Sequence, residues 1–175
     1  MRKLRTFELG RLSPQQYKEK KKKNLIVVLD QVRSGNNVGS IFRTSDALLV
    51  KSIYLCGITA VPPSSDIHKT ALDAEKTVHW EYFKHTEDAV TLLKEGTFKI
   101  YAVEQVEGSI FLPDFQPSEN ENIALIFGNE VKGVQQKIID LCDGCIEIPQ
   151  FGTKHSFNVS VSAGIVLWDV ACKLR

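Results

Sequence analysis

Short apolar runs and segments with helical spacing alternate along the chain. Continuous apolar runs, many of them β-branched, are typical of strands that are buried on both faces of a sheet. Such runs occupy residues 25–29 and 123–127, and further strands are predicted at residues 52–56, 78–83, 98–103 and 145–148. Segments predicted to be helical precede, separate and follow them, at residues 15–23, 37–49, 66–74, 86–96, 134–142 and 159–174. The alternation predicts an α/β fold, with a parallel sheet covered by helices on both faces.

The length and composition indicate one soluble domain. Apolar residues make up 43% of the 175 residues and charged residues 25%, proportions that are ordinary for a globular protein. No apolar run approaches the roughly 20 residues that cross a bilayer. The start of the chain also lacks the apolar stretch of a signal peptide. We therefore expect a cytoplasmic protein with no membrane partner.

Charge divides the chain into a basic N-terminal arm, residues 1–23, and a body, residues 24–175. The arm holds nine Lys or Arg and two Glu, a net charge of +7, whereas the whole chain has a net charge of only +1. Ser13 and Pro14 are suited to the cap and first position of a short helix in the arm. The charge is explained either by contact with a polyanion such as nucleic acid or by a solvated helix face.

The four cysteines are Cys56, Cys142, Cys145 and Cys172. Cys142 and Cys145 have the spacing of half a zinc site or of a redox pair. A zinc site needs four ligands, and no second pair of this kind lies elsewhere in the chain. We therefore favour four reduced, mostly buried thiols and expect no metal, with a zinc or redox protein as the alternative.

Ligands of parallel sheets bind beyond the carboxyl ends of the strands, so the segments that follow the predicted strands are the candidates for chemistry. The first, residues 30–43, turns through Gly35 and begins a helix near Asn37, which is suited to cap it. Arg43 lies less than two helical turns further on and carries a rigid fork of donors for phosphate. The alternative is that Asn37 is only a cap and Arg43 only a surface residue.

The second segment, residues 127–133, follows a fully apolar strand. Gly128 lets a ligand approach the backbone closely. Glu130 can accept a hydrogen bond from an amine or a hydroxyl, unless it is only the solvated residue of a tight turn. The spacing of a phosphate loop is missing here, and no glycine-rich dinucleotide fingerprint follows any strand.

The third segment, residues 148–159, is a polar loop before the last predicted helix. Asn158 can cap this helix. Ser156 lacks the strand–turn–helix motif of a hydrolase nucleophile, and the adjacent His155 faces elsewhere in most backbone conformations. A Ser–His nucleophile is therefore disfavoured.

Together the three segments resemble the three motifs of the SpoU/TrmH branch of the SPOUT RNA methyltransferases. The first motif matches at residues 37–43, the second at 125–133, and the third at 148–152 and 156–160. The similarity covers roughly residues 24–172, and the order and spacing of the three motifs fit as well. Three motifs in order make this resemblance specific, where one alone would be weak.

The resemblance implies a C-terminal trefoil knot, a homodimer with the active site at the subunit interface, and S-adenosylmethionine as the cofactor. By similarity, the donor is held by the strand-end loops. The positions that match are Val103, Glu104, Gly128, Ile148 and Phe157. An apolar slot with backbone hydrogen bonds suits an adenine. The family usually has Leu at the position of Phe157, so the shape of the slot is in doubt there.

The resemblance also implies a catalytic set and an RNA substrate. The matching positions are Asn37, Arg43, Glu130, Ser156 and Asn158. The reaction is displacement at the sulfonium methyl by a ribose 2′-oxygen, which must be aligned and deprotonated. The family's arginine is often assigned as the base, but a guanidinium group is effectively always protonated. Our hypothesis is that Arg43 clamps the adjacent phosphate and orients the hydroxyl, with Asn37 holding Arg43.

In this family, extensions outside the knotted core largely set the choice of RNA. The arm here is short, which favours tRNA over rRNA. If Lys20 to Lys23 touch phosphates, RNA affinity falls steeply with salt. The alternative function is that of a catalytically inactive, RNA-binding member of the same fold.

Overall fold

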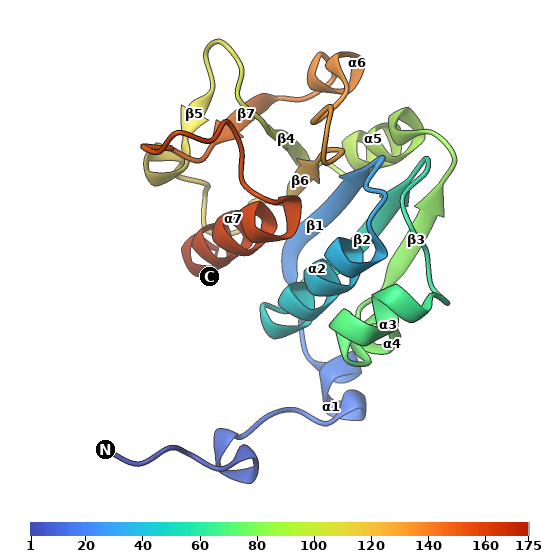
Figure 1. Cartoon of the computed structure of the whole chain (residues 1–175), viewed down its shortest axis with the longest axis vertical. Coiled ribbons are helices and arrows are strands. Elements are labelled where there is room, and N and C mark those ends of the chain that lie inside the picture. Colours follow the sequence, from blue (N-terminus) through green and yellow to red (C-terminus); the bar gives the residue numbers. More distant parts are fainter. Residues whose placement is uncertain (175) are drawn as a thin grey trace.

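The computed structural model describes residues 1–174, which fold around one parallel sheet (Figure 1). All the strand pairs are parallel. The sheet has seven strands in the order β3-β2-β1-β6-β4-β7-β5. Their bounds are β1 Lys23–Asp30, β2 Val50–Cys56, β3 Trp80–Phe83, β4 Lys99–Val103, β5 Ile110–Phe111, β6 Ile123–Phe127 and β7 Gly144–Glu147. The chain builds outward from β1 to β3, and β6 then returns to pair with the other side of β1.

Helices cover both faces of the sheet, as the sequence predicts. They are α1 Pro14–Glu19, α2 Gly35–Ala47, α3 Ser65–Ala71, α4 Ala74–Thr77, α5 Thr86–Glu95, α6 Gln136–Ile139 and α7 Val159–Lys173, with short 3-10 turns at Thr6–Leu9 and Leu112–Asp114. Helices α2, α3 and α7 pack on one face, which is turned toward the viewer in Figure 1. Helices α5 and α6 pack on the other face. The predicted α/β fold is confirmed, and the trefoil knot stays a prediction.

The two faces of the sheet form two separate cores, because successive side chains of a strand point to opposite sides. On β1, Leu25, Val27 and Leu29 belong to the core beneath α2 and α7. Ile26 and Val28 of the same strand belong to the core beneath α5 and α6. These five residues are at most 3% exposed, which explains why the run is apolar at every position rather than at every second one.

Several predicted boundaries are wrong, each for a local reason. Helix α2 begins at Gly35, and its cap is Ser34, whose hydroxyl accepts from the Asn37 N–H; Asn37 is inside the helix rather than its cap. The helix predicted at residues 66–74 is interrupted, because Leu72 and Asp73 adopt left-handed backbone conformations between α3 and α4. The helix predicted at 134–142 is shorter, and the two-residue strand β5 was not predicted. The predicted cap of α7 is confirmed, since the Asn158 carboxamide accepts from the Ser160 N–H at 2.9 Å.

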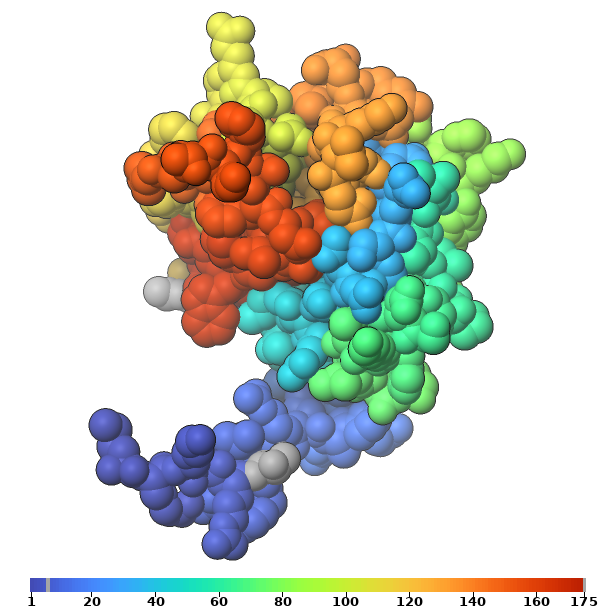
Figure 2. Space-filling model, viewed as in Figure 1, coloured from blue at the N-terminus to red at the C-terminus, as the bar shows by residue number. Residues whose placement is uncertain are grey.

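The basic arm joins the body through α1. Ser13 caps this helix and Pro14 occupies its first position, as expected. Tyr17 is buried against the body. The residues before α1 stand away from the body in Figure 2, at the blue end of the chain. The ammonium groups of Lys22 and Lys23 donate to the Tyr17 and Leu174 carbonyls.

No helix formed by residues 1–174 is both long enough and apolar enough to cross a bilayer.

Candidate active site

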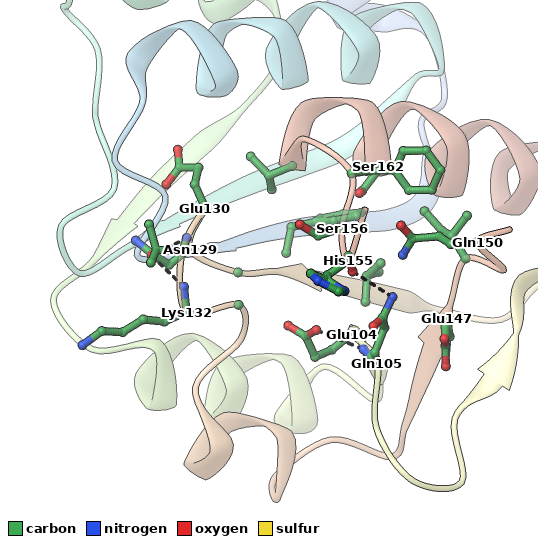
Figure 3. Close-up of a pocket in the computed structure, with 18 of the residues that line it drawn as sticks. Glu104, Gln105, Asn129, Glu130, Lys132, Glu147, Gln150, His155, Ser156 and Ser162 are labelled. Carbon is green, nitrogen blue, oxygen red and sulfur yellow. Dashed lines mark hydrogen bonds between the residues drawn. The ribbon is translucent and has the colours of Figure 1, made fainter. Parts of the chain in front are cut away.

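A cavity of about 280 Å³ lies beyond the carboxyl ends of β4, β6 and β7 (Figure 3). The loops that follow these three strands form its walls. All five positions that the resemblance assigns to the methyl donor line it, namely Val103, Glu104, Gly128, Ile148 and Phe157. Glu130 and Ser156 line it too. We call this space the donor cavity.

Gly128 is required by a close approach of the chain to itself. The loop after β6 folds back, so that Asn129 and Gly133 exchange two backbone hydrogen bonds of 3.0 and 2.9 Å. A Cβ on Gly128 would lie 2.1 Å from the Gly133 carbonyl carbon and from the Val134 nitrogen. The sequence indicated close approach by a ligand; in the structure it is the protein's own backbone that comes close.

Glu104, at the end of β4, also holds the loop that follows β6 in place. Its carboxylate accepts hydrogen bonds from the Val134 N–H and the Gln105 N–H, both at 3.0 Å. Gly133 has a φ of +66°, and a Cβ there would lie 2.1 Å from a Glu104 carboxylate oxygen. Glu104 therefore shapes the donor cavity by holding its rim.

A continuous polar network joins the three motif segments. Glu130 reaches from the second segment to the first, where its carboxylate accepts from the Arg33 and Ser34 N–H groups at 3.2 and 3.0 Å. Its carboxylate points toward the start of α2 in Figure 3. The Asn37 carboxamide donates to Glu130 at 3.2 Å and accepts from Asn158 at 3.1 Å. Segments about 90 and 120 residues apart along the chain are thus brought within hydrogen-bonding distance.

These hydrogen bonds decide the ionisation of Glu130. Partial desolvation alone would raise its pKa. The donors from Ser34, Asn37 and Arg33 outweigh that effect and hold the pKa of Glu130 below its ordinary value. The residue is therefore a carboxylate at neutral pH and is bound as one.

Arg43 is not part of this network. It lies on the exposed surface of α2, six residues beyond Asn37, or about 9 Å along the helix axis. It makes no hydrogen bond or ion pair with the residues that the structure describes. It lines a second cavity, of about 480 Å³, beside the basic arm. The prediction that Asn37 holds Arg43 is wrong within one chain, because both polar groups of the Asn37 side chain are bound to the network described above.

The model of the SpoU rRNA Methylase family matches residues 24–168. The chain belongs to this family. It is 31% identical to a tRNA (guanosine(18)-2′-O)-methyltransferase of Thermus thermophilus over 147 residues, which are 83% of this chain and 73% of that protein.

Solved structures of the family have the same fold as this SpoU methylase. The A. aeolicus TrmH/SpoU tRNA modifying enzyme aligns with a TM-score of 0.80 at 27% identity, over 91% of this chain and 81% of that one. An AdoMet-bound rRNA methyltransferase from Sinorhizobium meliloti aligns with a TM-score of 0.81 at 26% identity, over 94% of this chain. The SpoU methylase described here spans 62% of the length of the S. meliloti protein.

The structure adds residues to the site of this SpoU methylase that the sequence analysis did not single out. The Ser160 hydroxyl donates to the Asn158 side chain at 2.6 Å and lies 3.4 Å from that of Asn37. The Asn129 side chain donates to the Gln31 carbonyl at 2.8 Å and ties the second segment to the first. Both residues lie inside the matched motifs, next to positions already assigned. Their position inside the matched motifs was the signal in the sequence that could have identified them.

Asp30 was also missed, although it is fully buried at the end of β1. Its carboxylate accepts from the Thr86 hydroxyl at 2.6 Å and from the Gln135 side chain at 2.8 Å. It also accepts from the Gln135 N–H at 3.1 Å. The signal in the sequence was a lone carboxylate at the end of a fully apolar strand. Asp30 fixes the base of the loop that ends at Gln135, so it acts through that loop and not on a ligand.

All four cysteines of the methylase are free thiols, but only Cys56 and Cys145 are buried. Cys142 is half-buried, and Cys172 is exposed on α7. Desolvation raises the pKa of Cys56 and of Cys142 to about 12. Disulfide exchange needs the thiolate, which such values disfavour at neutral pH in the metal-free protein. Cys56 and Cys145 therefore contribute as small buried groups.

One group of side chains away from the donor cavity is close enough to share a cation. His68, Asp73 and Glu75 meet at the corner between α3 and α4. The His68 ring lies 2.8 Å from the Glu75 carboxylate, and the Lys76 ammonium lies 2.5 Å from Asp73. These interactions account for the cluster, and we assign no ligand to it.

Proposed function

We propose that this SpoU methylase transfers the methyl group of S-adenosylmethionine to a ribose 2′-hydroxyl of RNA, with tRNA as the favoured substrate. The observation that carries the proposal is the donor cavity. The five positions that match the family's donor site come from β4, β6, β7 and the loop before α7, yet all line one space. Relatives named as tRNA 2′-O-methyltransferases and an AdoMet-bound structure of the same fold support it.

The donor cavity has the chemistry that the cofactor needs. Val103, Ile148 and Phe157 offer apolar surface for an adenine, and the strand-end backbone offers hydrogen-bonding groups. The carboxylate of Glu104 also lines the cavity and suits a cationic ligand. When bound, S-adenosylmethionine supplies a methyl group on a positively charged sulfur, which is open to attack by an oxygen nucleophile. The protein's task is to hold this group and exclude water.

The polar network prepares the site before any ligand binds. Glu130, Asn37 and Asn158 hold the three segments in one arrangement, so little reorganisation is needed during the reaction. The Arg43 guanidinium has no internal partner and is available to clamp a phosphate next to the target ribose. In that position it orients the 2′-hydroxyl, which is how correct alignment speeds a displacement.

A homodimer completes the site in this proposal. Val161, Ile165 and Trp168 are 48%, 36% and 63% exposed, and together with Cys172 they form one apolar stripe along α7. A contiguous exposed stripe of this kind marks an interaction surface, and a two-fold interface pairs it with its own copy. Within one chain Arg43 lies outside the donor cavity. A second copy that docks on α7 would bring its Arg43 to that cavity.

The test is transfer of labelled methyl from S-adenosylmethionine to tRNA and rRNA transcribed in vitro, which carry no 2′-O-methyl groups. We expect label in alkali-resistant dinucleotides, and more of it in tRNA. Arg43→Ala should lower transfer at least about 100-fold, because positioning of the nucleophile is lost. The exposed Lys84, on the far edge of the sheet, is the charge-matched control, and Lys84→Ala should keep wild-type transfer.

Near-normal turnover by Arg43→Lys would contradict the clamp, because an ammonium cannot reproduce the planar fork of a guanidinium. Donor binding without transfer to either RNA would support the alternative of an inactive RNA-binding member of the family.

A further inference from the structure

The cavity beside Arg43 is walled by the basic arm, and we call it the arm groove. One side of it is formed by Gly10, Arg11, Leu12, Pro14 and Tyr17. The other side is formed by α2 and the turn after it, and the corner between α3 and α4 closes the end. Figure 1 shows α1 lying against this end of the molecule, beneath α2 and α4. At about 480 Å³ the arm groove is larger than the donor cavity.

We propose that the arm groove binds the RNA backbone next to the methylated ribose, with Arg11 of the arm and Arg43 of α2 each holding a phosphate. This inference rests on the proposed function and adds to it a second contact surface, built by the arm. The arm then selects RNA through two defined side chains rather than through its lysine run.

The balance of charge in the arm groove supports a polyanion. Arg11 and Arg43 both line it, and neither has a hydrogen bond or ion pair with any residue in the part of the chain that the structure describes. Of the two carboxylates that line it, Asp73 is paired with Lys76, whereas Asp46 accepts from the neutral Thr77 hydroxyl at 2.6 Å and keeps its charge. Two unpaired guanidinium groups therefore face one uncompensated carboxylate, and guanidinium forks match phosphate geometry.

A buried, unsatisfied group supports a ligand in the same place. Tyr17 lines the arm groove and is only 4% exposed, yet its hydroxyl has no hydrogen-bond partner among residues 1–174. Burial, together with the nearby Asp46 carboxylate, raises the pKa of Tyr17, so the hydroxyl stays protonated. An unpaired buried hydroxyl is costly. In this proposal, a phosphate or sugar oxygen that displaces the groove wall around Tyr17 accepts this donor.

The run of lysines at residues 20–23 is less suited to binding phosphate than its charge suggests. The Lys22 ammonium donates to the Tyr17 and Lys20 carbonyls and lies 4.1 Å from the centre of the Tyr17 ring. Lys23 is the first residue of β1 and donates to the Leu174 carbonyl at 2.6 Å. Lys23 therefore holds the arm against the body, and Lys22 binds groups within the arm itself.

The experiment compares Arg11→Gln with Lys18→Gln, which removes one charge from an exposed residue of α1 outside the arm groove. The probe is a fluorescently labelled pool of unmodified tRNA transcripts, and the full-length protein is used. We expect Arg11→Gln to weaken RNA binding, and to raise KM for RNA, about tenfold. The slope of log K against log salt should also fall by roughly 0.7 to 0.9 for the lost phosphate contact. Lys18→Gln should change each value less than about twofold.

Tyr17→Phe is the second variant. It removes an unsatisfied hydroxyl, so the melting temperature should stay the same or rise while RNA affinity falls. A purely structural role for Tyr17 would not move the two measurements in opposite directions.

Equal losses in Arg11→Gln and Lys18→Gln would overturn the arm groove, because they would show only a general effect of charge. A changed oligomeric state with unchanged RNA affinity would overturn it in favour of a protein partner. If the wild-type protein methylates RNA and Arg11→Gln does so equally well, the role of the arm groove is overturned, but the proposed function is not. A wild-type protein that neither binds nor methylates RNA would overturn the proposed function as well.

Discussion

The two ends of helix α2 are built in opposite ways. At its start, Asn37 is bound to Glu130 and to Asn158, and the loops around the donor cavity are tied to one another. Toward its end, Arg43 is exposed and unpaired beside the arm groove. One end is closed by internal hydrogen bonds, and at the other the Arg43 guanidinium has no partner among the described residues.

The proposed function explains this difference by what each end would bind. A donor cavity made of strand-end loops needs its backbone groups satisfied, because unpaired buried groups are costly. Internal donors and acceptors therefore hold the loops in place. An RNA surface must instead present cations that are not neutralised by the protein itself. In the SpoU methylase, the two requirements are met about two helical turns apart on the same helix.

The largest expected effect tests whether Arg43 and the donor cavity that it serves belong to the same chain or to the two chains of a dimer. Arg43→Ala and Gly128→Ala should each be inactive as homodimers. A heterodimer, isolated with two different affinity tags, has one intact Arg43 and one intact donor cavity on opposite chains. If they meet across the interface, the heterodimer should recover about half of the wild-type rate per dimer, because one of its two sites is complete. A heterodimer as inactive as its parents would show that Arg43 serves its own chain.

A smaller effect is expected from the closed end alone. Gly128→Ala places a Cβ 2.1 Å from backbone atoms of Gly133 and Val134. We expect a loss of about 2 to 3 kcal/mol in the free energy of unfolding, from overpacking, and weaker donor binding by calorimetry. Gly152→Ala is the matched control, because its Cβ would meet no atom within 4 Å. It should change stability by less than about 0.5 kcal/mol. Equal stability of the two variants would contradict the close approach at Gly128.

The smallest effect concerns Glu130, whose pKa lies below its ordinary value of 4.5. A carboxylate of this kind stabilises the fold fully above its unfolded pKa, and this contribution is lost as the pH falls through the lower, folded value. Glu130→Gln should therefore lower stability at pH 7 and flatten the loss of stability as the pH falls below the ordinary glutamate value of 4.5. Glu107→Gln, at an exposed glutamate after β4, is the control. Urea unfolding at several pH values makes the comparison. Parallel curves for wild type and Glu130→Gln would contradict the assigned hydrogen bonds.

Most of the fold was predictable because strands buried on both faces leave continuous apolar runs. The strand predicted at 123–127 is confirmed as β6 Ile123–Phe127, and the cap of α7 at Asn158 is also confirmed. The helix boundaries that failed depend on backbone conformation, as at Leu72 and Asp73. Non-glycine residues seldom adopt positive φ, so a local pattern does not reveal such a turn.

The sequence predicted which residues belong to the candidate site, but not which of them contact one another. The matched motifs brought Gly128, Glu130 and Asn158 into view, and all of them lie where the segments meet. For Gly128 the structure adds a second reason, because the backbone that crosses it belongs to Gly133 and Val134, while close approach by a ligand stays a prediction. Ser160 and Asp30 were missed because their importance lies in partners that are distant in sequence.

The sequence by itself determined the parallel α/β fold, the basic arm and the three strand-end segments, because periodicity, charge and motif spacing are local properties of the chain. Only the tertiary structure decided that Asn37 binds Glu130 and Asn158 while Arg43 lies apart beside Arg11. Those relations depend on strand order, which joins segments about 90 to 120 residues apart. They depend equally on the packing that points each side chain of α2 in its own direction.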